Sequence, residues 1–197
     1  MQNQLFKGNF SGVIGNDIID LKLALSERKS ESRRFLNKVF TEREKAIIQN
    51  SENPESTLWF LWSMKETAYK AHQRNFSLPR SLNPRTFECI PVSEKQGVVQ
   101  KGKYKYHVTS ESSSDFIHTY IAAKSVFKKV YSKKFLSKQA ILESICSSFN
   151  LPKTAGTIEK DGYGIPYLNL DKHTKKLPLS LSHHGNFTAF IIPLINS

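Results

Sequence analysis

A change in hydrophobic period between residues 72 and 86 separates two kinds of structure in this chain. Residues 41–72 carry apolar side chains at helical spacing, whereas residues 86–125 consist of short runs of β-branched and aromatic residues. The second pattern is typical of an antiparallel meander of strands. Residues 135–149 return to helical spacing and precede a strand, a turn and a strand. We therefore expect an α+β fold in which a helix followed by antiparallel strands occurs twice.

Local signals place several of the expected elements. Residues 12–19 form an apolar run that predicts a strand, with a break at Gly15-Asn16. Thr41 precedes Glu44 by the spacing of a capping box, which predicts the start of a helix. The repeat of helix and strands is expected to break near residues 126–133.

The charge balance indicates an anionic partner. Lys and Arg number 29 against 17 Asp and Glu, which gives a formal net charge of +12 at pH 7. Such a field attracts nucleic acid, anionic lipid or an acidic protein, and charge alone does not choose among them. No segment approaches the roughly 18 apolar residues of a membrane helix, and no secretory signal is visible. With two cysteines at no metal-binding spacing, the composition predicts a cytoplasmic protein that does not act in a membrane.

The sharpest chemical signal lies in the second predicted helix, which Ser56 or Thr57 caps and which runs to about His72. At about 100° per residue, Glu66 falls between two tryptophans and Lys65 between two leucines. Two charged groups thus project into apolar arcs of the helix. Because an unpaired buried charge is costly, each of them is expected to have a partner.

A purely structural role is open for these groups. Glu66 and Lys70 have the i, i+4 spacing of an ion pair on a helix surface, and Asp17 suits an Asx turn or a helix N-cap. The chemical alternative joins them in one site. Asp17 and Glu66 supply two hard oxygen ligands for Mg²⁺, with water and diphosphate oxygens completing the coordination. Lys65 and Lys70 then neutralise phosphoryl oxygens as charge moves to the leaving group.

A polar strand near the end of the sequence offers further binding groups. Ser180 and Ser182 place two hydroxyls on one strand face, His183 adds an imidazole, and Gly185 allows the following turn. These groups suit a phosphate cradle. Two other interpretations are open, namely a hairpin with polar surface residues and a Ser/His catalytic pair, although no G-x-S-x-G elbow occurs.

Together these motifs resemble those of the 4′-phosphopantetheinyl transferase superfamily, which includes the holo-acyl-carrier-protein synthases and the surfactin-synthetase-type activating enzymes. The family pattern has G-x-D, F-T-x-x-E, W-x-x-K-E-x-x-x-K, G-x-P and S-x-S-H in separate segments. In this chain the matching segments are residues 15–17, 40–44, 62–70, 164–166 and 180–183.

The resemblance implies a reaction and a role for the matched residues. Members of the family transfer the 4′-phosphopantetheine group of coenzyme A to a serine of an apo acyl or peptidyl carrier protein, as in fatty acid or polyketide biosynthesis. Adenosine 3′,5′-bisphosphate is released. By resemblance, Asp17 and Glu66 bind Mg²⁺. Glu66, Lys65 and Lys70 are the catalytic residues that the resemblance implies.

The resemblance also implies how the two substrates bind. Lys65 and Lys70 contact the phosphate and pantetheine side of coenzyme A, whereas Ser182 and His183 hold its 3′-phosphate. Carrier proteins of this kind are strongly acidic, which gives the positive net charge a specific partner.

One position departs from the larger enzymes of the family. These carry a second acid two residues after the aspartate, where this chain has Ile19, and Asp20 follows one place later, as in the small synthases. The resemblance therefore implies a metal completed by water and a carrier serine that is deprotonated through bound water or Glu66.

The order of the motifs predicts the architecture. In the large enzymes the S-x-S-H motif lies in the N-terminal half, whereas here it follows the other motifs, as in the small synthases. We expect residues 12–125 to form a metal-binding half and residues 133–197 a shorter half with G-x-P and S-x-S-H. A pseudo-twofold axis would relate the halves around one site, which favours a monomer over the homotrimer of the small synthases.

Two other functions fit part of the sequence. A basic nucleic-acid-binding protein would explain the net charge but not the charges within the Trp-rich helix, and no helix-turn-helix, zinc-finger or RNP pattern occurs, so we expect no nucleic-acid partner. A catalytically silent relative that binds coenzyme A or a carrier would explain Ile19, but not the combination of Asp17, Lys65 and Glu66.

Overall fold

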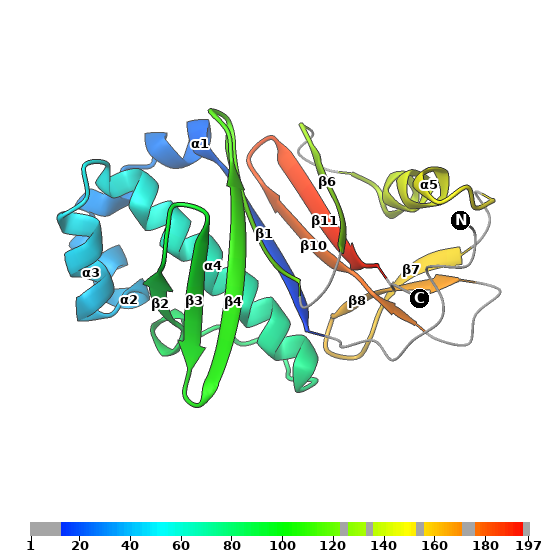
Figure 1. The fold of residues 1–197 in the computed structure, drawn as a ribbon, viewed down its shortest axis with the longest axis horizontal. Coiled ribbons are helices and arrows are strands. Elements are labelled where there is room, and N and C mark those ends of the chain that lie inside the picture. The colour runs from blue at the N-terminus through cyan, green and yellow to red at the C-terminus, as the bar shows by residue number, and fades with distance from the viewer. Residues whose placement is uncertain (1–12, 123–125, 133–135, 153–155, 171–175, 195–197) are drawn as a thin grey trace.

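The computed structural model describes residues 13–122, 126–132, 136–152, 156–170 and 176–194. In chain order, the strands, helices and short 3₁₀ helices (η) are β1 (Ile14–Asp20), α1 (Leu21–Ser26), η1 (Lys29–Glu31), α2 (Arg33–Val39), α3 (Glu42–Gln49), α4 (Pro54–Asn75), η2 (Pro84–Thr86), β2 (Glu88–Pro91), β3 (Gln96–Lys101), β4 (Tyr104–Ser112), β5 (Phe116–Ala122), β6 (Val126–Tyr131), α5 (Lys138–Ser148), β7 (Gly156–Lys160), β8 (Pro166–Leu170), β9 (Leu177–Pro178), β10 (Ser180–His184) and β11 (Phe187–Pro193). We call β1–β5 with α1–α4 the first half and β6–β11 with α5 the second half. The halves meet along β1, β10 and β11 (Figure 1).

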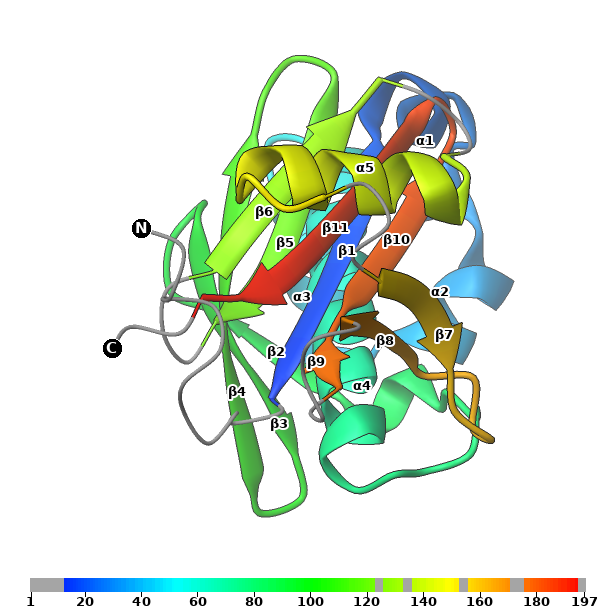
Figure 2. The same cartoon turned by 90° about the vertical axis from the view of Figure 1, so that its right-hand side faces the viewer.

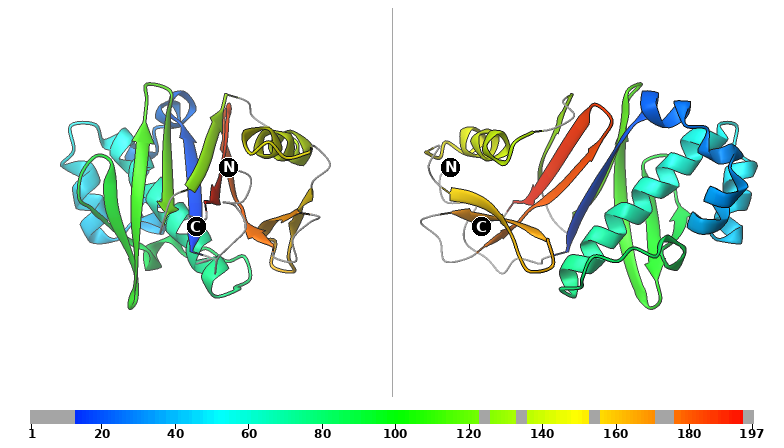
Figure 3. Two further views of the ribbon diagram at one scale, coloured as in Figure 1. Left: turned by 45° about the vertical axis from the view of Figure 1, so that its right-hand side comes forward. Right: turned by 180° about the vertical axis from the view of Figure 1, so that it is seen from behind.

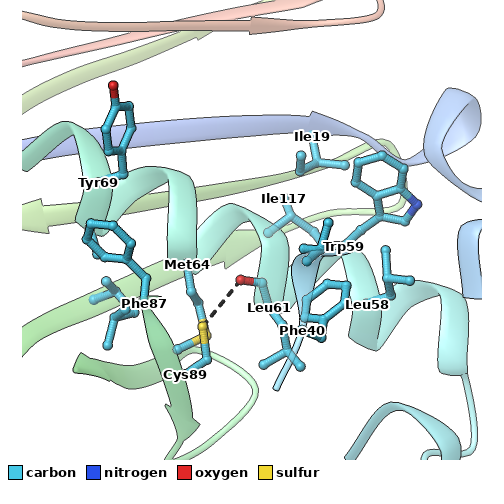
Figure 4. Close-up of a cluster of buried hydrophobic side chains, with 14 of the residues drawn as sticks. Ile19, Phe40, Leu58, Trp59, Leu61, Met64, Tyr69, Phe87, Cys89 and Ile117 are labelled. Carbon is cyan, nitrogen blue, oxygen red and sulfur yellow. Dashed lines mark hydrogen bonds between the residues drawn. The ribbon is translucent and has the colours of Figure 1, made fainter. Parts of the chain in front are cut away.

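Both halves combine helices with antiparallel strands, so the fold is α+β, as predicted. The first half has a five-stranded sheet in the order β1-β5-β4-β3-β2. α4 crosses one face of this sheet, as the right-hand view of Figure 3 shows. Because the side of α4 that faces the sheet is apolar, helix and sheet share one core, shown in Figure 4 around Leu58, Leu61 and Met64.

α4 is longer at both ends than the sequence signals indicated. Its N-cap is Asn53, whose side chain accepts a hydrogen bond from the Ser56 N–H (3.1 Å). Pro54 occupies the first turn, where a missing N–H leaves no hydrogen bond unmade. The helix continues past His72 to Asn75. Neither α4 nor any other described helix is apolar enough over its length to cross a membrane.

Two other local predictions had opposite outcomes. The capping box of Thr41 and Glu44 is present at the start of α3, as predicted. The break predicted at Gly15-Asn16 is wrong, because β1 runs through both residues. Gly15 serves close packing instead, since a Cβ atom there would lie 2.2 Å from the backbone oxygen of Thr67 in α4.

The second half contains two three-stranded sheets, ordered β10-β11-β6 and β7-β8-β9. α5 lies in front of the first sheet in Figure 2, and its apolar side joins a separate core that includes Ile145 and Phe190. The sequence predicted that the repeat breaks near residues 126–133, and Val126–Tyr131 of this segment form β6, which pairs with β11. Its lysines conceal the strand pattern, because β6 is only half-buried. The sheet of the second half therefore begins before residue 133.

Candidate active site

One side of α4 lines a cavity of about 320 Å³ between the two halves. Glu66, Lys70 and Arg74 follow one another along this side at a spacing of about one turn. The facing wall comes from β10 and from the loop before β8, and it includes His183. A second hollow of about 270 Å³ shares Glu66, Lys70 and His183 with the first and reaches Asp17. We call the two hollows together the cleft.

Asp17 lies within β1 and faces the cleft. The residue that caps the helix after β1 is Asp20, so the interpretation of Asp17 as an N-cap is wrong. The Asp17 side chain is 11% exposed, and its Oδ1 accepts a hydrogen bond from Lys70 Nζ (3.0 Å). The same ammonium group donates to the backbone oxygen of Asn16 (2.8 Å). Lys70 thus ties α4 to β1, and its partner is Asp17 rather than Glu66.

The carboxylates of Glu66 and Asp17 influence each other. Burial raises the pKa of Glu66 to about 7, and the negative charge of Asp17 adds to this effect, whereas Lys70 and Arg80 oppose it. Burial also raises the pKa of Asp17, against the charge of Lys70. Glu66 forms no ion pair with the described residues. The cleft therefore holds two repelling carboxylates that a cation would neutralise.

This donor set fits a hard divalent cation that keeps part of its water shell. Mg²⁺ is usually bound by one or two carboxylates together with water and phosphate oxygens of the substrate. In the part of the chain that the structure describes, no group of three or more His, Cys, Asp and Glu side chains could hold a metal ion. Asp17 and Glu66 can supply two oxygen ligands, so further ligands have to come from water or substrate.

Lys65 lies on the other side of α4, within the core of the first half. Its Nζ pairs with Glu44 Oε1 at 2.7 Å, and both side chains are fully buried. The ammonium group also donates to the backbone oxygens of Pro84 (3.1 Å) and Phe87 (2.5 Å). Its three donors are therefore occupied. The catalytic and coenzyme A-binding role that the resemblance implied for Lys65 does not fit this position, because protein encloses the group.

In the polar strand predicted as a phosphate cradle, some side chains contact β1 and others line the cleft. Ser180 and Ser182 are buried against β1: Ser180 Oγ accepts a hydrogen bond from the Asn16 N–H (3.0 Å), and Ser182 Oγ accepts one from Asn16 Nδ2 (2.9 Å). His183 is exposed and lines both hollows. Ser182 also lines both, so it belongs to the junction and to the cleft.

Several basic groups of the cleft were not predicted from the sequence motifs. Arg80 and Lys160 line the cavity from the loop after α4 and from β7. Arg74 is 8% exposed and donates to the backbone oxygens of Pro166 (3.0 Å) and Leu179 (2.6 Å), both in the second half. None of these basic residues lies in a motif, so their positive charge was the only signal available.

The comparison with known families matches the first half of the chain. The model of the family described as 4′-phosphopantetheinyl transferase superfamily matches residues 13–124. A holo-[acyl-carrier-protein] synthase from Protochlamydia amoebophila (strain UWE25) is 38% identical over 64 residues, which cover 32% of this chain and 52% of that protein. The chain thus spans about half the length of the curated relative that it matches.

Proposed function

We propose that this chain, which belongs to the 4′-phosphopantetheinyl transferase superfamily, moves the 4′-phosphopantetheine group of coenzyme A onto a serine of an apo carrier protein and releases adenosine 3′,5′-bisphosphate. The observation that carries the proposal is the pair of buried, mutually repelling carboxylates of Asp17 and Glu66 in a cleft with basic groups. Phosphoryl transfer depends on positioning and charge neutralisation, which this combination can supply.

Asp17 and Glu66 are the residues that would hold Mg²⁺. The ion would neutralise the diphosphate oxygens of coenzyme A and orient them for attack. The raised pKa values of both carboxylates support this assignment, because they reflect negative charges that the protein alone leaves incompletely neutralised.

The basic groups of the cleft act on the phosphates. Lys70 is held by Asp17 and by the backbone of Asn16, which keeps its ammonium group beside the carboxylates. From there it neutralises a phosphoryl oxygen as charge moves to the leaving group. Ser182 and His183, at the facing wall, bind the 3′-phosphate of coenzyme A.

The carrier serine must lose a proton when its oxygen bonds to the β-phosphorus and the anhydride bond to the leaving group breaks. Ile19 stands where the larger enzymes have a second acid. Asp20 does not replace that acid, because its two oxygens accept backbone N–H groups from Leu23 (3.1 Å) and Asn186 (2.8 Å). We therefore assign proton transfer to Glu66 or to water bound beside it.

The remaining parts of the proposal concern partners and assembly. The carrier protein is acidic, which complements the net charge of +12. A monomer suffices, because both walls of the cleft come from one chain. We also propose that a pseudo-twofold axis relates the halves. The packing of a helix against antiparallel strands in each half supports this part of the proposal. The cytoplasmic location and the pathway stay predictions from the sequence.

Intact mass spectrometry tests the proposed reaction. The protein is mixed with several apo acyl and peptidyl carrier proteins, coenzyme A and Mg²⁺, and one carrier is expected to gain the mass of one phosphopantetheine arm. The mass gain should vanish with excess chelator. A carrier in which the serine is replaced by alanine should gain no mass. A protein that leaves every carrier unmodified, although it is folded, would contradict the proposal.

A further inference from the structure

β1 is the last strand of its sheet, so the backbone N–H groups on its outer edge need partners other than a strand ladder. Two of them donate to side chains of β10. The Asn16 N–H donates to Ser180 Oγ (3.0 Å), and the Asp20 N–H donates to His184 Nδ1 (2.9 Å). Both bonds join residues 164 positions apart, so β1 and β10 run in the same direction. β10 lies beside β1 (Figure 2), and its side chains complete the edge of β1.

Asn16 makes more bonds across this junction than its backbone N–H. Its Nδ2 donates to Ser182 Oγ (2.9 Å) and lies 3.2 Å from His118 Nε2 on β5. Its backbone oxygen accepts the hydrogen bond from Lys70 Nζ (2.8 Å). One fully buried residue therefore connects β1, β5, α4 and β10.

This network is not optimal for stability. Among the described residues, neither Asn16 Oδ1 nor His118 Nδ1 has a hydrogen-bond partner, although both atoms are buried. An unpaired buried polar atom destabilises the folded state, because it has given up its hydrogen bonds to water. An apolar side chain at position 16 would avoid part of this cost, so stability alone does not account for the asparagine.

The neighbours of Asn16 give it a second role. Asp17 follows it directly and shares the ammonium group of Lys70 with its backbone oxygen. Ser182, which its side chain contacts, precedes His183 at the facing wall of the cleft. The position of Asn16 therefore sets the separation between the carboxylates and the wall that carries His183.

We propose that Asn16 is a positioning residue that holds Asp17 and Lys70 at a fixed distance from Ser182 and His183, so that one coenzyme A molecule contacts both walls at once. The inference rests on the proposed function. Binding to two walls is tight only when their separation is set before the ligand arrives, because otherwise the ligand has to order them. Side-chain hydrogen bonds rather than a strand ladder set that separation here.

The Asn16→Ala variant tests the inference. It removes the bonds to Ser182 and His118 and leaves Asp17, Lys70 and His183 intact. We expect the KM for coenzyme A and the Mg²⁺ concentration at half-maximal rate to rise by about tenfold, the equivalent of one buried hydrogen bond, with a smaller change in kcat. Ser180→Ala removes the acceptor of the Asn16 backbone N–H. It should therefore also raise the KM for coenzyme A and the Mg²⁺ concentration at half-maximal rate.

A matched control comes from the other end of the same strand. Asp20→Asn leaves one acceptor oxygen, which can still cap α1 through the Leu23 N–H, and removes the other, which accepts the Asn186 N–H across the junction. Asp20 lines neither hollow of the cleft. The thermal unfolding temperature of the variant should fall, while the KM for coenzyme A stays at the wild-type value. Equal KM increases in Asp20→Asn and Asn16→Ala would overturn the inference, since any loosening of the junction would then suffice.

Calorimetric titration of coenzyme A in the presence of Mg²⁺ separates failure of this inference from failure of the proposed function. If the wild-type protein binds coenzyme A and Asn16→Ala binds it about tenfold more weakly, the result supports the inference independently of turnover. Equal binding to both proteins overturns the positioning role and leaves the proposed function standing. A wild-type protein that binds no coenzyme A overturns both.

Discussion

Lys65 and Glu66 are neighbours in α4, yet they belong to two different polar sites. Lys65 and Glu44 form what we call the core pair. The oxygens of Glu44 also accept the N–H groups of Cys89 (2.7 Å) and Thr41 (2.8 Å), so both charged groups have complete sets of partners. Glu66 belongs to what we call the cleft cluster, together with Asp17 and Lys70. The ammonium group of Lys70 pairs with Asp17, and Glu66 forms no ion pair with the described residues.

The difference distinguishes charges that support the fold from charges available for chemistry. Removing one partner of a completed buried pair leaves an uncompensated charge, so such a pair becomes essential to the fold that contains it. Carboxylates buried with too few partners have perturbed pKa values and attract cations or substrates. Lys65 and Glu66 differ in this way because adjacent residues of α4 are rotated by about 100° about the helix axis.

The largest expected effect is on the core pair. Lys65→Met should lower the free energy of unfolding by about 3–5 kcal/mol, because Glu44 is left buried without its countercharge. Urea unfolding measures this loss. The double variant Lys65→Met with Glu44→Gln should recover part of it, since the unpaired charge is gone. If Lys65→Met keeps wild-type stability but loses activity, Lys65 has the catalytic role that the family resemblance implied, and the comparison fails.

Glu66→Gln should have the opposite signature. We expect the transfer rate to fall by about 100-fold or more, because one of two charged metal ligands is lost, while the stability of the metal-free protein at pH 7 stays the same or increases. The increase follows from relief of the repulsion with Asp17. Transfer assays and urea unfolding measure the two effects.

Glu52→Gln is the matched control for this substitution, because Glu52 is exposed in the loop before α4. It should change neither quantity. A loss of stability in Glu66→Gln comparable to that of Lys65→Met would place Glu66 with the structural charges.

Much of this comparison was predictable from hydrophobic periodicity. The helical pattern of α4 predicted that Lys65 and Glu66 project into apolar arcs and need partners, and the shorter period downstream predicted the meander of β2–β5. The identity of the partners was not predictable, since Glu44 approaches Lys65 only when α3 packs on α4. Adjacency in a family motif suggested one shared role for Lys65 and Glu66, although a helix turns adjacent side chains apart. Arg80 lies in a loop with no periodic pattern to indicate its contacts.

The pH dependence of stability should also separate the two sites. The pKa of Glu66 is raised from 4.5 to about 7, so between these pH values the folded chain binds more protons than the unfolded chain. The free energy of unfolding of the metal-free protein should therefore fall as pH rises from about 4.5 to 7, by an amount on the order of 2 kcal/mol for this group. Asp17 contributes with the same sign, because its pKa is raised as well.

Urea unfolding with chelator at several pH values measures this dependence, and the difference between wild type and Glu66→Gln isolates the cleft cluster from other carboxylates. The slope should be smaller in Glu66→Gln, and Mg²⁺ should bind more weakly to the wild type below pH 7, since protons compete for the carboxylates. Identical slopes in the two proteins would mean that Glu66 titrates at its ordinary pKa.

The smallest expected effect comes from exposed charges next to each site. Arg80 is exposed, lines both hollows of the cleft and opposes the rise in the pKa of Glu66. Arg85 is also exposed and follows Pro84, whose backbone oxygen accepts a hydrogen bond from Lys65. Arg80→Ala should raise the KM for coenzyme A by about two- to fivefold at low salt, because an exposed charge contributes less than about 1 kcal/mol and is screened by ions. Arg85→Ala should leave that KM unchanged, since a charge near the core pair has no anionic ligand to attract. Both variants could instead raise the KM for coenzyme A equally, with added salt removing the effect in both. That result would mean that the net charge of the surface, rather than the cleft cluster, attracts the substrate.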